Sequence, residues 1–194
     1  MPASRKRQRG VTLIELLIVI SLMSILAAAI MPSASPGVHS QLSAAAQRVA
    51  GDIAYCRSLA LTNNSKYRIR FQLDQNKYIL EHSGSNSTLN ALPSSLLRAE
   101  SDPPHQQIVN LHDLPGVVMP VDLVAVQALT APSQFVGALE FGPLGETTRS
   151  VETVIWLGCG YEPDRLYQAI RVNPVTGLTW VDSVQLNKPA TPTN

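Results

Sequence analysis

The sequence predicts an α+β fold in which a long N-terminal helix, first apolar and then amphipathic, packs on an antiparallel β-rich head. Three observations predict it. Residues 11–31 form a nearly continuous apolar run. Residues 38–60 repeat apolar side chains at steps of three and four, the period of an amphipathic helix. From residue 66 onward, short alternating segments are separated by turns rich in Gly and Pro, which is typical of antiparallel sheets.

Length and composition restrict the class of protein. The chain has 194 residues, 45% hydrophobic and 15% charged, which suits one domain plus a membrane segment and neither a disordered nor a polytopic membrane protein. The net charge is +1, but four of the 15 basic residues precede the apolar run. Without them, 11 basic residues face 14 acidic ones, a net charge of −3. This mildly acidic body does not fit a strongly nucleic-acid-binding domain.

The apolar run predicts a transmembrane helix at residues 11–31. A helix of this length extends about 31 Å, enough to cross a bilayer core. Positive charge lies only on its N-terminal side, so this end is expected in the cytoplasm and the body outside it. A secretory signal peptide cut at residues 27–29 and a plain single-pass anchor are the alternatives. Neither explains Glu15, because a carboxylate inside a membrane helix costs about 2.5–3.5 kcal/mol and is usually functional.

Residues 7–17, RQRGVTLIELL, resemble the class III leader of type IV prepilins and type II secretion pseudopilins. In that family, a membrane aspartyl peptidase cuts after the glycine and methylates the new amino terminus. The resemblance implies that residues 1–10 are a cleaved basic leader, that the cut falls between Gly10 and Val11, and that Val11 is N-methylated. Glu15 takes the place of the family's glutamate, whereas Val11 departs from the commoner Phe or Met.

The physical chemistry of this segment agrees with an assembly role for Glu15. Cleavage leaves a charged amine at the start of an apolar helix, and a carboxylate four residues further on can neutralise the amine of a neighbouring subunit. Such a pair is much stronger in low dielectric than in water. The helix is therefore expected to act first as a membrane anchor and later as the hydrophobic core of a filament.

The rest of the chain is predicted to be a second helical segment and a head. Residues 32–64 continue the helix outside the membrane, interrupted near Pro32 and Pro36 and ending near residues 63–64. Residues 65–194 form the head. Strands are expected at residues 66–73, 77–81, 116–124, 135–141, 151–157, 166–172 and 178–181. Residues 83–107 are expected to be a flexible insertion, with a partner-binding loop as the alternative.

Three further motifs resemble a narrower group, the minor pseudopilin H and FimT-like proteins. An Arg-x-Leu-Ala sequence ends the second helix at residues 57–60. A Phe-x-Pro-x-Gly turn follows at residues 141–145, and an Ile-x-Val…Thr-Gly pattern occupies residues 170–172 and 176–177. This resemblance implies the pilin-like form of the α+β fold.

The sequence contains no enzyme motif such as HExxH, a P-loop, G-x-S-x-G or CxxC. The protein is therefore not expected to be an enzyme or to hold a cofactor. His105, His112 and Asp113 lack a spacing that would make them converge on a metal. Glu162 and Asp164 offer too few oxygens for calcium. No metal is expected.

Two other features leave alternatives open. Cys56 and Cys159 form a disulfide or remain two buried free thiols. Four basic residues form a small patch or a solvated strand face: Arg57, Lys66, Arg68 and Arg70. Some FimT-like proteins bind DNA and carry arginine after the glycine of the last hairpin. Residues 177–180 read GLTW here, which argues against nucleic acid as a partner.

These features predict a minor pseudopilin of a type II secretion system. It would be a single-pass protein of the bacterial inner membrane with a cytoplasmic N-terminus and a periplasmic head. Its partners would be prepilin peptidase and the other pseudopilins of a filament that drives protein export. A minor pilin of a type IV pilus or DNA-uptake filament is the alternative, because the leader is common to all of these. A membrane-anchored periplasmic enzyme or binding module is the alternative from another class.

Overall fold

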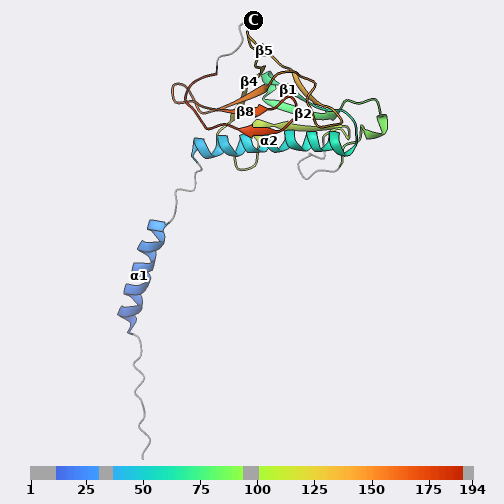
Figure 1. Ribbon diagram of the computed structural model, residues 1–194. Helices are drawn as coiled ribbons and strands as arrows, with labels where there is room; N and C mark the ends of the chain where they lie inside the picture. Colours follow the sequence, from blue (N-terminus) through green and yellow to red (C-terminus); the bar gives the residue numbers. More distant parts are fainter. Residues whose placement is uncertain (1–11, 31–36, 94–100, 190–194) are drawn as a thin grey trace, which may run out of the picture. The chain divides into compact units, whose positions relative to one another are not determined.

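The computed structural model describes residues 12–30, 37–93 and 101–189, which belong to two compact units, Met1–Pro36 and Gly37–Asn194. Within the described residues, the first unit contains the helix α1 (Leu13–Ile30), and the second contains the helix α2 (Val38–Thr62) and two antiparallel sheets (Figure 1). A helix on antiparallel sheets is the α+β fold that the sequence predicts.

The helix α1 begins at a threonine cap. The Thr12 hydroxyl oxygen accepts a hydrogen bond from the backbone N–H of Glu15 (3.3 Å), and the Thr12 carbonyl accepts one from the N–H of Leu16 (3.2 Å). A capping side chain satisfies an N–H group that has no partner inside the helix. The cap explains why α1 begins at Leu13, inside the predicted segment 11–31.

The helix α2 follows the predicted amphipathic stripe, and its buried side chains pack against both sheets. It ends at Thr62 with Asn63 as its C-cap, and Asn64 adopts a positive φ of 46°, a conformation that asparagine tolerates after a helix. The buried face is rich in small residues, which lets the sheets approach the helix axis closely. Its apolar members are Leu42, Ala45, Ala46, Val49, Ala50, Ile53, Cys56, Leu59 and Ala60.

The first sheet has the strand order β3-β2-β1-β6, and all its neighbouring strands are antiparallel. Its strands are β1 (Tyr67–Gln72), β2 (Lys77–His82), β3 (Gln106–Asn110) and β6 (Ala138–Phe141). In β1 the residues Tyr67, Ile69 and Phe71 are buried, as the alternation predicts, while the basic residues between them face outward.

The second sheet has the strand order β5-β4-β7-β8-β9 and is also antiparallel. Its strands are β4 (Val121–Ala128), β5 (Gln134–Phe135), β7 (Thr153–Cys159), β8 (Leu166–Val172) and β9 (Thr179–Val181). Short 3-10 helices follow β1 (Leu73–Gln75), precede β3 (Ser87–Leu89) and follow β3 (Leu111–Asp113). The core lies where α2 meets the inner faces of both sheets.

The predicted strand at residues 135–141 is two strands in different sheets. The N–H of Val136 donates to the carbonyl of Val126 in β4, whereas the carbonyl of Gly137 accepts from the N–H of Phe71 in β1. The chain therefore leaves one sheet and enters the other between residues 136 and 137. The sequence of this segment, FVGALEF, carries no sign of such a crossing.

The predicted flexible insertion at residues 83–107 extends too far at its C-terminal end, because its last two residues belong to a strand. The first part contains the 3-10 helix Ser87–Leu89, and the last two residues begin β3, which pairs with β2. Residues 94–100 lie outside the described residues. The strand was missed because its pattern in the sequence, QQIVN, is mostly polar. The predicted strand at residues 116–124 is also misplaced, since β4 begins at Val121.

Candidate functional site

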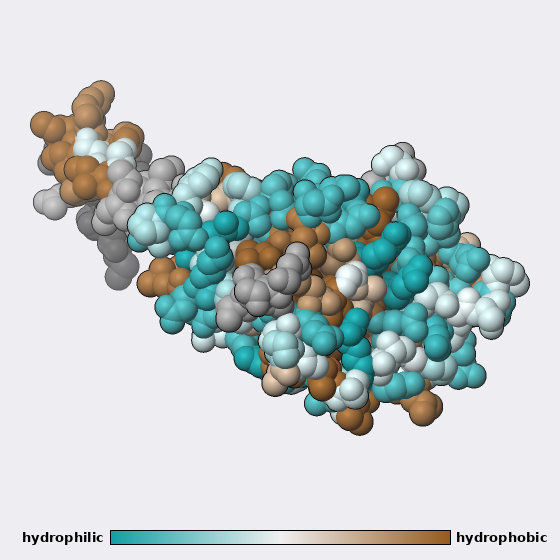
Figure 2. Space-filling view, turned by 90° about the horizontal axis from the view of Figure 1, so that it is seen from above, coloured by the Kyte–Doolittle hydropathy of each residue, from teal (hydrophilic) through white to brown (hydrophobic). Residues whose placement is uncertain are grey.

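The helix α1 presents apolar side chains in every direction. Its large apolar side chains from Leu13 to Ile25 are 47–81% exposed, and they occur on every side of the helix. The helix is accordingly drawn mostly in the hydrophobic colour in Figure 2. A helix that is apolar all round is normally buried in a large core or in lipid. This surface therefore requires lipid or other protein chains to cover it.

Glu15 is the only charged residue of α1, and it lies in the first turn. A negative side chain is favourable there because the backbone N–H groups give the helix start a partial positive charge. The carboxylate is solvent-exposed, so it is available to a group outside the helix.

Two serines in α1 need no partner outside the helix. The hydroxyls of Ser21 and Ser24 each donate to the backbone carbonyl four residues earlier, in both cases at 2.8 Å. Such bonds satisfy a hydroxyl within the helix itself. Through Ile25, Glu15 is thus the polar side chain of α1 that lacks a hydrogen bond to its own helix.

Gly10 and Val11, the predicted cleavage and methylation residues, lie outside the described residues, as do Met31, Pro32 and Pro36. When only the described stretches of chain are considered, no helix has both the length and the apolar character needed to cross a membrane.

In the head, one arginine connects three segments that are far apart in sequence. The Nε–H of Arg57 on α2 donates to the carbonyl of Gly145 (3.2 Å) and to the carbonyl of Thr176 (2.8 Å). These carbonyls belong to the turns at residues 141–145 and 173–177. We call Arg57 and these two turns the Arg57 junction. It brings together the three motifs on which the resemblance to the pseudopilin H and FimT-like group depends.

Glycine is required at the centre of this junction. Gly177 has a φ of +66°, and a Cβ added there would meet the carbonyl oxygen of Gly145 and lie 3.0 Å from both the Arg57 side chain and the Phe141 ring. Gly145 also has a positive φ, +81°. Glycine fits both positions because the backbone is left-handed there and because the two turns approach each other closely.

The four basic residues of the possible patch all have partners. Arg68 and Arg70 form ion pairs with Glu81, at 2.6 and 3.3 Å. Lys66 lies 3.6 Å from Glu140, and Arg57 donates to backbone carbonyls. Lys66, Arg68 and Arg70 are therefore paired with carboxylates, and Arg57 belongs to a separate set of contacts on α2.

The possible disulfide is not formed, because Cys56 and Cys159 are separate, fully buried free thiols. Gly160, next to Cys159, lies beside Val38 at the start of α2. Cys56 is five turns further along the same helix, which is about 27 Å at 1.5 Å per residue. A disulfide requires Cα atoms within about 7 Å. Burial raises the pKa of the Cys56 thiol well above its ordinary value, which disfavours the thiolate form.

The suggested metal ligands do not converge. No group of three or more His, Cys, Asp or Glu side chains among the described residues is placed to hold a metal ion. His112 instead contacts Asp122 through its Nε2 (2.9 Å), and Asp113 accepts a hydrogen bond from Asn110.

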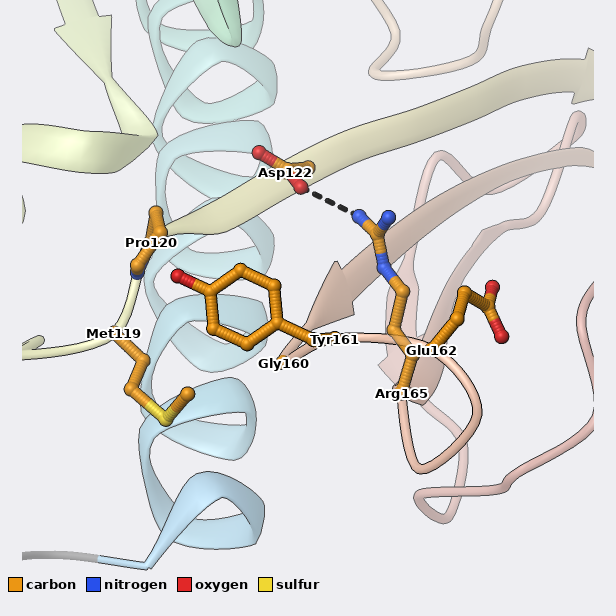
Figure 3. A pocket seen from close by; sticks show the side chains of 7 residues that line it. All are labelled: Met119, Pro120, Asp122, Gly160, Tyr161, Glu162 and Arg165. Carbon is orange, nitrogen blue, oxygen red and sulfur yellow. Dashed lines mark hydrogen bonds and ion pairs between the residues drawn. The ribbon is translucent and has the colours of Figure 1, made fainter.

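A small pocket lies where the start of β4 meets the turn after β7 (Figure 3). The guanidinium of Arg165 points at the carboxylate of Asp122 across it, at 2.5 Å. Glu162 accepts a hydrogen bond from the Tyr167 hydroxyl (2.8 Å). Asp122 and Arg165 thus form an ion pair with each other, and nothing in the geometry of this pocket indicates a particular ligand. Its lining residues are Met119, Pro120, Asp122, Gly160, Tyr161, Glu162 and Arg165.

Comparison with known proteins identifies the N-terminal segment. Residues 5–31 match the family model described as the prokaryotic N-terminal methylation motif. The match covers the N-terminal segment alone, the part of the chain that contains Gly10, Val11 and Glu15. The motif implies processing by prepilin peptidase, a membrane-anchored N-terminus and assembly with other pilins.

Two crystal structures of the type IV minor pilin FimU of Pseudomonas aeruginosa (strain PAO1) are similar to the chain. One is 14% identical, covers 73% of this chain and 92% of its own, and has a TM-score of 0.44. The other is 15% identical, covers 76% of this chain and 88% of its own, and has a TM-score of 0.43. A comparison with curated proteins gives no match.

Proposed function

We propose that the protein is a minor pseudopilin of a type II secretion system. It is inserted in the inner membrane through α1, loses residues 1–10 to prepilin peptidase, and joins a periplasmic pseudopilus that drives protein export. One observation carries the proposal: the methylation motif at residues 5–31 contains an apolar, exposed helix whose only charge is Glu15.

The chemistry of assembly follows from these residues. Cleavage between Gly10 and Val11 creates an amino terminus, and methylation of an amine keeps its positive charge. In an apolar filament core, this charge needs a carboxylate close by, because an unpaired buried charge costs several kcal/mol. The exposed Glu15 carboxylate of a neighbouring subunit provides that partner.

The Arg57 junction supports the placement near the H group. Its three segments are the motifs that resemble this group, and in the head they form one hydrogen-bonded unit. The three motifs that carry the resemblance therefore contact one another and stabilise the same part of the head.

A minor pilin of a type IV pilus or of a DNA-uptake filament is the second candidate, since it would share the leader. DNA uptake is the less favoured role. The basic residues of β1 are paired with Glu81, and residues 177–180 contain no arginine. We expect weak DNA binding by the head at physiological salt.

Two measurements on the native protein test the proposal. Mass spectrometry should find an N-terminus at Val11 that carries a methyl group, and a chain that still begins at Met1 or that begins at Ile30 would contradict the pilin-like role. Cross-linking in cells should then recover subunits of the secretion pseudopilus. Recovery of type IV pilus or DNA-uptake subunits instead would favour the second candidate.

A further inference from the structure

Large apolar side chains are exposed in each of the three segments that the Arg57 junction connects. A Cβ at Gly145 would lie 3.2 Å from the Leu61 side chain, and a Cβ at Gly177 would meet the Gly145 carbonyl oxygen. The end of α2 and the two turns therefore lie side by side. Scattered exposed apolar residues are normal, but a group of them in one place marks an interaction surface. We call this group the junction patch: Leu61, Leu144, Val175 and Leu178.

The two turns of the junction patch carry apolar residues at positions where polar ones are usual. Gly, Pro, Asn, Asp and Ser dominate turns because they satisfy or shape the backbone there. Leu144 and Val175 are instead large apolar residues, 83% and 77% exposed. An apolar side chain left in water contributes no burial to the stability of the head, so these two residues gain a stabilising contact only from a partner.

The backbone that carries these two side chains is held in place. The Glu146 carboxylate accepts a hydrogen bond from the N–H of Leu144 (3.0 Å), and the Asn173 side-chain oxygen accepts one from the N–H of Val175 (2.9 Å). Arg57 fixes both turns to α2. A surface that is ordered before binding loses little conformational entropy when a partner docks. The junction patch is therefore preorganised.

The charges near the junction patch are directed at its own backbone. Within residues 57–62, 141–147 and 173–178, the charged side chains are Arg57 and Glu146. Arg57 donates to two turn carbonyls, and Glu146 accepts from a turn N–H. The exposed side chains between them are aliphatic. A partner is therefore expected to meet the junction patch with an apolar, uncharged surface rather than with a complementary charge.

We propose that the junction patch binds the head of a neighbouring pilin-like subunit in the filament, an inference that rests on the proposed function. A standard interface between free proteins buries about 800 Å² of each partner. Even an aromatic side chain buries only about 150–250 Å², so four partly exposed aliphatic side chains fall short of a stable free dimer. They suit heads that the assembled α1 helices already hold together, because such heads meet at a high effective concentration.

The head offers a matched position far from the junction patch. Val118 is 77% exposed, as Val175 is, and its N–H donates to the side chain of Gln41 near the start of α2 (2.8 Å). Leu61 lies 20 residues further along the same helix than Gln41, which is about 30 Å at 1.5 Å per residue. A change at Val118 therefore has the same chemistry and exposure as one at Val175, at the opposite end of α2.

Photo-cross-linking of the full chain in cells tests the proposed partner. Benzoylphenylalanine is incorporated at residue 175 or at residue 118, filaments are sheared off after irradiation, and the adducts are identified by mass spectrometry. We expect at least about tenfold more cross-linking to pilin-like subunits from residue 175, because the probe reacts only with groups in contact. Equal cross-linking from both residues, or adducts of residue 175 with lipid or with proteins of other classes alone, would overturn the inference.

A second measurement uses polar substitutions. The double variant Leu144→Ser, Val175→Ser should be recovered in filaments at least about tenfold less than the parent, whereas Val118→Ser should stay within about twofold. All of them should keep the thermal stability of the parent, because the positions are exposed. Undiminished recovery of the double variant would overturn this inference alone. A parent chain that is not processed at Val11, or that never enters filaments, would overturn the proposed function together with it.

Discussion

The guanidinium of Arg57 donates a hydrogen bond of 2.8 Å to the backbone carbonyl of Thr176, which lies 119 residues further along the chain. The same Nε–H is shared with the carbonyl of Gly145 at 3.2 Å. The end of α2 is thereby fixed to two turns, one after each of two strands from different sheets. At this point the Arg57 side chain and two backbone carbonyls connect the helix to both sheets.

Replacing Arg57 with alanine is expected to destabilise the head by about 1–3 kcal/mol, because hydrogen bonds from a charged donor are lost and two turn carbonyls lose their partner. Urea denaturation of a fragment beginning at Gly37 measures the effect. Ser58→Ala, an exposed change on the same helix, is the control and should stay within about 0.5 kcal/mol of the parent. Equal stability of the two variants would show that the Arg57 junction does not stabilise the head.

Two glycine substitutions should change stability in opposite directions. Gly177→Ala is expected to cost more than about 1 kcal/mol, because its φ is +66° and the new Cβ meets the carbonyl of Gly145. Gly51→Ala is the matched control. It lies inside α2 with open space around it, so alanine should stabilise the helix by about 0.5–1 kcal/mol. Thermal unfolding of both variants tests the pair, and a stable Gly177→Ala variant would contradict the account of the two turns.

Acid should weaken the head through Glu81. Burial of this carboxyl opposes ionisation, but hydrogen bonds from Arg68 and Gln106 and the charges of Arg68 and Arg70 outweigh it and lower the pKa of Glu81. A carboxyl with a lowered pKa stabilises the folded state above its unfolded pKa, about 4.3 for glutamate, and this contribution is lost as the pH falls through the folded pKa.

The stability of Glu81→Gln should therefore decline less between about pH 5 and pH 3 than that of the parent. Urea denaturation at several pH values measures both proteins. Asp74→Asn is the control, because it changes an exposed carboxylate outside the arginine network. Parallel curves for the parent and Glu81→Gln would contradict the prediction.

Glu15→Leu should impair entry into filaments and leave leader cleavage largely intact. Removal of a carboxylate eases insertion of α1, and cleavage depends on the Gly10 junction. When the variant subunit docks in a filament, however, the amino terminus of a neighbouring subunit lacks its counter-charge. This loss of several kcal/mol would slow assembly by orders of magnitude. The measurements are N-terminal processing and recovery in sheared or cross-linked filaments. Ile14→Leu is the matched apolar control, and normal recovery of Glu15→Leu would exclude an assembly role.

The features determined by short-range pattern could be predicted from the sequence. The methylation motif, α2, β1 and β8 depend on residues within one segment, because a helical or alternating period states which face of that segment is buried. Burial of Tyr67, Ile69 and Phe71 was predictable for this reason. The leader motif was recognisable because a charge, a glycine and a carboxylate stand at set distances along one chain segment.

The tertiary structure alone decided which segments meet. The Arg57 junction and the hydrogen bonds of His82 with Ser65 and Asn90 join residues that no local pattern relates. The separation of Cys56 from Cys159 likewise follows from no local pattern. The crossing between sheets at residues 136–137 is of the same kind, since it depends on which strand edge offers free backbone groups. The spacing of apolar residues along the chain specifies which face of one helix or strand is buried. The packing of α2 against two sheets determines which distant side chains then lie within hydrogen-bond distance.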